Sequence, residues 1–492
     1  MFTHRRSCFA LALALLSLSG CVAVSRTEGV RHVQQQVSRA DAAAPHFMDW
    51  DDRTASDTRV TELLAAPLTA SAAVEVAYLR NPQILEAYAR LGLSQADVVA
   101  ASRIANPAVS SSLITGAGER QVIGGIAQSL TELLLLSARK RAAAGEYERT
   151  QQLVAAALLD LDRDTEAAWY RYVSTEQVSA MREAVAHAAE VSATLAKRFF
   201  DAGNISELEL ELNRTAAVQA RIAAVRAYRD ARAAKYLLHQ KMGLAGNPAW
   251  HALKELPEPV AVADAADALV VLAHDHRADI IAARQEVALL GDTLRAAKRW
   301  RWLGNVEVGV QRERETDGRI LTGPTLALAL PIFNQGQAGI ARAEAQLEAS
   351  RARLSALETA TDSSVRLGLE RVAAAHQVAE AFRVSLVPQQ ELIAKRQQER
   401  QNFMFVGQFE LLLSKQQEYD AYEGYLEAVR DYWLARVDLV RAVGADLPDG
   451  SVSTDPVVGV DAILGARAES VERMNHDHGG EPHDDGTVRS DW

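Results

Sequence analysis

The histidines near the end of the chain are the residues whose spacing comes closest to a metal site. His476, His478 and His483 each have a neighbouring Asp, and imidazole with carboxylate is a borderline ligand set. Their tail is polar and rich in glycine, so it lacks the fixed surroundings of a true site. A loosely ordered tail is one interpretation and metal ligation the other. The remaining sequence contains no Ser/His/Asp set, phosphate loop or metal-ligand spacing, so we expect neither an enzyme nor a cofactor.

Cys21 is the second residue with a chemistry of its own. It follows a basic start, a short apolar run and the small residues Ser19 and Gly20, a layout typical of a secretory signal peptide over residues 1–20. The sequence Leu18-Ser19-Gly20-Cys21 resembles a bacterial lipobox. This resemblance implies that Cys21 is acylated and tethers the mature chain to a membrane. No later run of 18 apolar residues predicts a transmembrane helix.

Charge and composition narrow the class of protein further. Without the first 20 residues the chain carries 51 basic and 64 acidic side chains, a net charge of −13. This balance argues against a nucleic-acid partner, because phosphate backbones are bound by basic surfaces. Ala, Leu, Glu, Arg and Gln dominate the composition, which is typical of long helices.

Two copies of one structural plan account for most of the chain. Asn81-Pro82 aligns with Arg277-Ala278, and Gly203 aligns with Gly407 in the same order. We therefore expect a signal peptide (1–20), an N-terminal extended segment (21–69), a first repeat (70–243), a linker (244–265), a second repeat (266–444) and a C-terminal segment with the polar tail (445–492).

Each repeat contains a pair of short strands. In the second repeat Val306, Val308 and Val310 alternate with polar or small residues, and Leu326, Leu328 and Leu330 do so on the return. The polar turn is expected at 312–319. About ten residues per strand with period two are typical of a membrane-spanning strand. The first repeat shows the same alternation in weaker form, and a small soluble sheet is the alternative.

A long helix follows the strands of each repeat and then returns. The absence of helix breakers predicts helices over 137–201 and 338–405, the second kinked at Pro388. Returning helices are expected over 206–242 and 408–444, with Ser206 and Glu209 as a capping box. Apolar residues recur every three or four positions, which favours antiparallel coiled-coil hairpins over a plain helical bundle.

The lipobox, the duplicated plan and the segment Leu330-Pro331-Ile332-Phe333-Asn334-Gln335-Gly336 together resemble the outer-membrane factor family, the TolC-like channels of tripartite efflux and type I secretion systems. The resemblance implies a mainly α fold with a small membrane β part. Long antiparallel coiled-coil helices would form a periplasmic α-barrel, and a homotrimer would share a transmembrane β-barrel with four strands per chain. The first repeat departs from the family at 130–136, where Pro and Gly are missing.

The same resemblance implies a function. The chain would be a passive exit duct in the cell outer membrane, lipid-anchored, surrounded by outer-membrane lipid and extending into the periplasm. Its partners would be a periplasmic adaptor protein and an inner-membrane pump. The histidines of the tail favour metal ions as cargo. The alternative is a lipid-anchored periplasmic coiled-coil scaffold without a channel.

The resemblance also implies site residues at the helical tips. The turns around Gly203 and Gly407 are expected to dock the adaptor. In the family, acidic residues six and nine positions after the second tip glycine constrict the periplasmic mouth. Those positions are Leu413 and Gln416 here, so we expect a mainly apolar constriction, with Glu209 as the matching acidic residue of the first tip. The alternatives are that Leu413 belongs to the coiled-coil core and that Glu209 lies on a solvated helix face.

Overall fold

The computed structural model of the chain describes residues 26–40, 47, 53–116, 119–246, 248–448 and 457. Cys21, His476, His478 and His483 lie outside the described residues. The chain divides into two compact units, which are described separately below. Unit 1 comprises residues 1–39, 83–158 and 277–360, and unit 2 comprises residues 40–82, 159–276 and 361–492.

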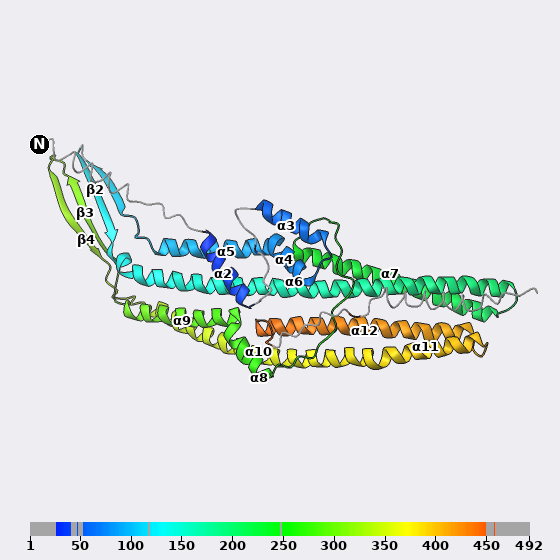
Figure 1. Ribbon diagram of the computed structural model, residues 1–492. Helices are drawn as coiled ribbons and strands as arrows, with labels where there is room; N and C mark the ends of the chain where they lie inside the picture. The colour runs from blue at the N-terminus through cyan, green and yellow to red at the C-terminus, as the bar shows by residue number, and fades with distance from the viewer. Residues whose placement is uncertain are drawn as a thin grey trace, which may run out of the picture. The chain divides into compact units, whose positions relative to one another are not determined.

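Unit 1 is built around one antiparallel sheet of four strands (Figure 1). The strands are β1 (Ala108–Gly116), β2 (Glu119–Ser129), β3 (Val306–Arg314) and β4 (Ile320–Leu328), in the order β1-β2-β3-β4. The two predicted hairpins thus exist, and they pair with each other through β2 and β3. The expected polar turn at 312–319 is shorter than predicted, since β3 extends to Arg314. The return strand ends at Leu328, so Leu330 lies beyond it.

The two faces of this sheet differ in chemistry. Residues opposite each other in the register share a face, and this places Val109, Ile126, Val310 and Val308 on one side with Leu326. Large apolar side chains on this face are exposed, among them Val109 at 77% and Leu326 at 70%. The other face carries Ser, Thr, Gln, Glu and Gly residues as well as Ile114, Ile123 and Leu321. The sheet of the single chain therefore has a largely apolar face and a more polar one.

Helices connect to this sheet at the ends opposite its turns (Figure 1). They are α5 (Pro82–Ala101), the first part of α6 (Leu130–Asp201), α9 (Ala278–Arg299) and the first part of α10 (Gln337–Ala381). The unit also contains α2 (Arg26–Ala40), which adjoins no strand in the chain. Helix α6 begins seven residues before the predicted start at 137. It starts directly after β2 because the Ser129 hydroxyl accepts a hydrogen bond from the Glu132 amide at 3.3 Å and no breaker follows.

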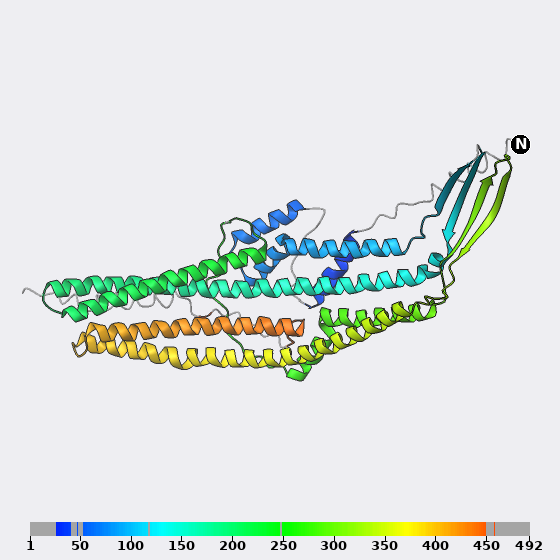
Figure 2. The same cartoon turned by 180° about the vertical axis from the view of Figure 1, so that it is seen from behind.

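Unit 2 contains two long helical hairpins, each formed by neighbouring antiparallel helices (Figure 2). The second part of α6 returns as α7 (Glu207–Met242), and α11 (Val387–Asn402) returns as α12 (Gln408–Val443). These returning helices agree with the prediction to within one residue at each end. The unit also contains α3 (Arg53–Ala65), α4 (Ala70–Arg80), α8 (Ala266–His276), the end of α10 and the π-helical segment η1 (Phe382–Leu386).

Near Pro388, where the sequence predicts a kink, the structure contains a π-helical turn. The Val387 amide donates to the Phe382 carbonyl, five residues back, and Pro388 follows immediately. Proline has no amide hydrogen, so the ladder is interrupted at this point, and π turns commonly absorb such interruptions. Across the hairpin, Gly424 of α12 leaves room for the Phe382 ring. A Cβ at position 424 would lie 2.6 Å from that ring.

Aromatic side chains fill the core of unit 2. The rings of Tyr170 and Trp433 stack with centroids 5.1 Å apart, and Trp169 is 2% exposed. Their polar atoms are satisfied, since the Trp169 indole donates to the Leu68 carbonyl at 2.9 Å and the Trp433 indole to the Pro257 carbonyl at 2.8 Å. The linker between the repeats is therefore packed onto α12 at Pro257, and the segment before α4 is packed onto α6 at Leu68.

Among the described helices, none combines the length and the apolar composition that a bilayer-spanning helix requires.

Candidate functional site: the tips of the helical hairpins

The first tip is a tight turn that glycine makes possible. After α6 ends at Asp201, Gly203 adopts a φ of +75°, which is the left-handed region. The amides of Gly203 and Asn204 donate back to the carbonyls of Phe200 and Phe199, both at 2.8 Å, and so close the end of the helix. This satisfies carbonyls that the helix end would otherwise leave without partners.

The predicted capping box opens the returning helix of the first tip. The Glu209 amide donates to the Ser206 hydroxyl at 3.3 Å, while the Glu209 carboxylate accepts from the Ser206 amide at 2.9 Å. The same carboxylate lies 3.1 Å from the Ser206 hydroxyl. Glu209 is exposed, but its carboxylate is held at the N-terminus of α7, where a negative charge is favourable.

The second tip has the same backbone with different residues. Here Met404 occupies the left-handed position with a φ of 59°, and the amides of Met404 and Phe405 donate to the carbonyls of Gln401 and Arg400, both at 2.9 Å. Gly407 has a φ of −77° and begins α12, with its amide donating to the Glu410 carboxylate at 2.5 Å. Gly407 therefore opens a helix, whereas Gly203 follows the end of one.

The roles of these residues correct the alignment of the two tips. The sequence pairs Gly203 with Gly407, but the turns pair Gly203 with Met404 and Ser206 with Gly407. The counterpart of Glu209 is then Glu410 rather than Leu413. The alignment on glycine was wrong because the second left-handed position carries Met. The Glu three residues after each helix start is the signal that identifies the correct register.

The residues expected at the constriction lie on an exposed face of α12. Leu413 is 47% exposed, and Gln416, one turn further on, is also exposed. The residues that α12 buries near this tip are Ser414 at 4% and Glu418 at 1%. The alternative that Leu413 belongs to the coiled-coil core is therefore wrong for the single chain. No hydrogen bond or ion pair joins Leu413 or Gln416 to Glu209 in the part of the chain that the structure describes.

Exposed apolar side chains concentrate at the second tip. Phe403, Met404 and Phe405 are 73%, 92% and 74% exposed, and the two phenyl rings lie 6.3 Å apart. The turn of the first tip instead contains Ala202, Gly203 and Asn204. Three consecutive large apolar residues in a turn have no packing role within the chain, and such exposed clusters commonly mark interaction surfaces. Sequence reasoning named the tip but missed this difference between the two turns.

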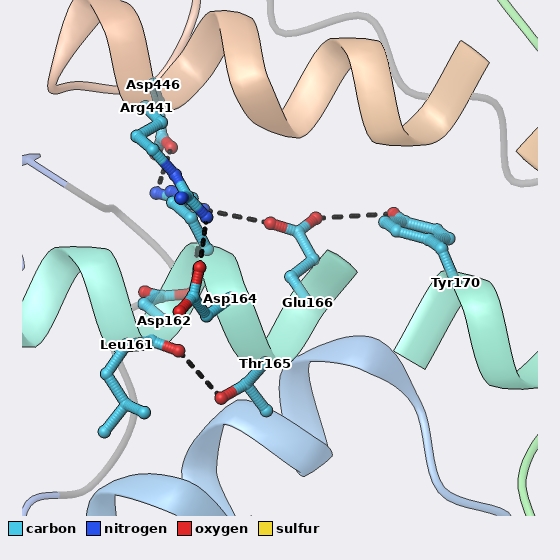
Figure 3. Close-up of polar contacts among 9 residues, drawn as sticks. Leu161, Asp162, Asp164, Thr165, Glu166, Tyr170, Arg441 and Asp446 are labelled. Carbon is cyan, nitrogen blue, oxygen red and sulfur yellow. Dashed lines mark hydrogen bonds and ion pairs between the residues drawn. The ribbon is translucent and has the colours of Figure 1, made fainter. Parts of the chain in front are cut away.

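A carboxylate at the other end of the hairpins joins both returning helices to α6, and Figure 3 shows it beside Arg441 of α12. Asp164 accepts from Lys241 at 2.7 Å and from Arg441 at 2.6 Å, the last-turn cations of α7 and α12. Burial alone would raise the pKa of Asp164, but these two hydrogen bonds outweigh it and lower the pKa below 3.8. Beside it, Arg163 pairs with Glu166 at 3.2 Å, and Glu166 accepts from the Tyr170 hydroxyl at 3.4 Å.

This charged cluster is a structural junction rather than a metal centre. The cations Arg163, Lys241 and Arg441 each pair with a carboxylate, either Glu166 or Asp164, so these charges are used within the chain. Among the described residues, no group of three or more His, Cys, Asp or Glu side chains is arranged to hold a metal ion. The histidines of the tail lie outside the described residues.

Comparison with solved structures shows which known proteins share this fold. The chain matches a membrane protein from Pseudomonas aeruginosa with a TM-score of 0.63 at 17% identity, over 79% of this chain and 92% of that one. It matches the outer membrane protein VceC of Vibrio cholerae with a TM-score of 0.63 at 14% identity, over 76% and 96% of the two chains.

A third similar structure is the open state of the MtrE outer membrane channel of Neisseria gonorrhoeae, with a TM-score of 0.62 at 15% identity, over 76% and 88%. The chain has the fold of the TolC-like outer-membrane channels. This fold confirms the expected combination of long helical hairpins and a small sheet. Comparisons with models of protein families and with curated protein sequences find no match.

Proposed function

We propose that this chain is the outer-membrane component of a tripartite efflux system, a passive trimeric exit duct for substrates that an inner-membrane pump and a periplasmic adaptor deliver. The observation that carries the proposal is the four-stranded sheet of unit 1. It has one largely apolar, exposed face, and its strand β2 continues directly into α6, a helix of 72 residues. Such a face is suited to lipid, and the channel-like fold supports the same use.

The open edges of the sheet support a homotrimer. Among the strands that the structure describes, β1 pairs only with β2, and β4 pairs only with β3. Each outer strand thus keeps a row of backbone groups without a ladder partner, and such rows are not tolerated in hydrocarbon. Four strands are too few to close on themselves, so strands from further copies would complete the sheet. A scaffold without a channel would leave both the edges and the apolar face uncovered.

The tips would meet the adaptor and hold the gate. The apolar residues Phe403, Met404 and Phe405 offer a surface for a protein partner, and Gly203 and Gly407 shape the turns. Leu413 and Gln416 point away from the packed side of α12, so neighbouring copies could bring them together at the mouth of the duct. Glu209 and its counterpart Glu410 would act there as helix caps.

The anchor and the cargo extend the proposal to residues outside the described ones. Acylated Cys21 would hold the chain in the outer membrane, and His476, His478 and His483 favour metal ions as the cargo class. Mass spectrometry of the mature N-terminus tests the anchor. Growth of a deletion strain on graded copper, zinc and cobalt salts, with and without the wild-type chain, tests the cargo.

Planar-bilayer recording of the purified full chain tests the function itself. We expect a trimer by native mass spectrometry, with stepwise ion conductance after insertion from either detergent or lipid vesicles. Single cysteines on the two edge strands, Ser110→Cys on β1 and Thr325→Cys on β4, should form oxidised cross-links only between copies when combined in one mixture. A monomer that neither inserts nor conducts would overturn the proposal and favour the scaffold.

A further inference from the structure

We propose that Arg312 and Arg314, with Arg120, form a site for the phosphate groups of outer-leaflet lipid, specifically bisphosphorylated lipid A. This inference rests on the proposed function, because it requires the apolar face of the sheet to lie in the outer membrane. It concerns the end of the sheet at which the strands turn, where the apolar face gives way to basic side chains.

The register of the sheet puts these arginines on the apolar face. Arg312 lies opposite Gly124 and Thr322, and Arg314 lies opposite Val122 and Ile320. Val308 and Val310 precede them on the same face of β3, because every second residue of a strand points to the same side. All four side chains are exposed, while the residues between them are half-buried. The basic groups therefore continue an apolar surface instead of facing the polar side of the sheet.

Their neighbours leave the guanidinium groups available to a ligand. None of Arg120, Arg312 and Arg314 forms an ion pair with any carboxylate whose side chain the structure describes. The carboxylates of β3, Glu307 and Glu313, alternate onto the opposite face. In the following turn, Arg319 pairs with Asp317 at 3.5 Å, so that cation is already partnered. Small or apolar residues flank Arg312 and Arg314 on both sides, and their alkyl stems can lie along that surface.

The other end of the apolar surface fixes the orientation relative to the membrane. Beyond β4 the chain exposes Leu330, Ile332 and Phe333, at 64%, 64% and 97%, and the Trp302 ring is 56% exposed before β3. Large aromatic rings are enriched at membrane–water interfaces. The long helices begin at this end, so in an exit duct it faces the periplasm. The arginine end then lies at the outer leaflet.

The chemistry of the arginines selects the phosphate. A guanidinium forms forked, charge-assisted hydrogen bonds with phosphate oxygens, and it does so best where an apolar surface excludes water. Arg312 and Arg314 are two residues apart on one strand, so their Cα atoms lie about 7 Å from each other. The two guanidinium groups can therefore bind two phosphates or bind one phosphate together. Lipid A supplies phosphates and acyl chains together, which matches a basic rim above an apolar face.

Binding of lipid A to the purified full chain tests the inference. The double variant R312Q/R314Q is compared with wild type by native mass spectrometry and by lipid titration in micelles. The matched control is R351Q/R353Q, which removes two exposed arginines at the same spacing from α10. We expect R312Q/R314Q to bind bisphosphorylated lipid A about tenfold or more weakly, the control to equal wild type, and R312K/R314K to keep most of the affinity.

Three outcomes would overturn the site. If R312Q/R314Q and wild type bind lipid A with equal affinity, the arginines do not take part in recognition. If dephosphorylated lipid A binds as tightly as the bisphosphorylated form, the phosphate groups are not what the site recognises. If phosphatidylglycerol binds as tightly as lipid A, the site is not specific for outer-leaflet lipid. Conductance is recorded on the same preparations, so the two ideas separate: conducting channels without lipid discrimination contradict only this inference, whereas wild-type protein that does not conduct contradicts the proposed function.

Discussion

Met404 is a residue that lowers the stability of its own turn while exposing an apolar side chain for contact with another molecule. A left-handed conformation costs a residue with a Cβ about 1 kcal/mol, a cost that glycine avoids. Gly203 occupies the same position of the first tip without this cost, yet Met404 stands in the second tip with its side chain 92% exposed. The fold gains nothing from this side chain, so its use lies outside the single chain.

We therefore expect Met404→Gly to separate coupling from assembly. The turn should form at least as well, because glycine relieves the backbone, and trimer yield and conductance should equal wild type. Binding of the adaptor should weaken by about tenfold, since one exposed apolar anchor is lost. Co-purification with the cognate adaptor and the efflux-dependent resistance of cells measure this. Met404→Leu serves as the control that keeps an apolar side chain. Undiminished coupling in Met404→Gly would show that the side chain has no docking role.

His239 should make the stability of unit 2 depend on pH. Its Nε2 accepts from the Trp250 indole at 2.7 Å, and the ring is 3% exposed. Burial lowers the pKa of His239 below 6.5, and the nearby cations Lys235 and Arg232 lower it further. The folded state thus holds this histidine neutral. Its contribution to stability is complete above pH 6.5 and is lost as the pH falls below that value.

The matching experiment is thermal unfolding in detergent between pH 7.5 and 5.5. Over this pH range we expect the melting temperature of wild type to fall by about 1–3 °C more than that of His239→Gln. The glutamine amide oxygen can still accept a hydrogen bond from Trp250, but the amide does not titrate. His276→Gln is the control, since that histidine is exposed in α8. Identical pH profiles for His239→Gln and wild type would contradict the assignment.

At the scale of the element, the second hairpin depends on a fit between a π turn and a glycine. A Cβ at position 424 would meet two ring carbons of Phe382 at 2.6 and 2.7 Å. We expect Gly424→Val to lower the free energy of unfolding by about 1–3 kcal/mol, because the ring must leave its place between the helices. Denaturant unfolding in detergent and limited proteolysis near residue 386 measure the loss.

Two controls isolate this clash from helix propensity. Gly339→Val makes the same change in α10, where a Cβ would meet no atom within 4 Å, and it should be neutral or slightly stabilising. Adding Phe382→Ala to Gly424→Val should recover part of the loss, because the space occupied by the ring becomes free. A Gly424→Val variant as stable as wild type would mean that the π turn repacks without cost.

The elements themselves were largely predictable from the sequence. Both returning helices followed from their turns and periodicity, and the strands of the second repeat followed from alternating Val and Leu. The start of α6 was predicted too late, because a strand followed directly by a helix leaves no Pro or Gly to mark it. An irregularity near Pro388 was predicted, but its π-helical form was not, and the contact of Phe382 with Gly424 joins residues 42 positions apart in the sequence.

The candidate site was less predictable, because its details depend on residues distant in the sequence or on backbone angles. Asp164 meets Lys241 and Arg441 across 77 and 277 residues, and no local pattern reports such a meeting. The register of the second tip was wrong because Met404 gives no sign of a left-handed backbone. The tips were nevertheless located correctly in the chain, since the helices on either side fix where a turn must occur.

At the scale of the whole molecule, exposed apolar side chains of unit 2 can be buried only in an assembly of several copies. Leu413 is half exposed in the single chain, although a leucine near the end of a coiled-coil hairpin is usually covered. If three copies surround an axis, three such leucines can pack together at the mouth. An apolar ring of this kind blocks ions by excluding water, without any charged group.

We therefore expect Leu413→Asp to open the resting duct. Three carboxylates close to one axis would repel each other and draw water into the ring, so the closed arrangement would lose stability. Resting conductance in planar bilayers should rise several-fold, and cells should admit more of a large antibiotic such as vancomycin. Leu367→Asp is the matched control, because that leucine is 50% exposed on α10 and lies 36 residues before the α11–α12 turn. If Leu413→Asp forms normal trimers with wild-type conductance, the constriction lies elsewhere, and Glu209 and Gln416 are the next residues to substitute.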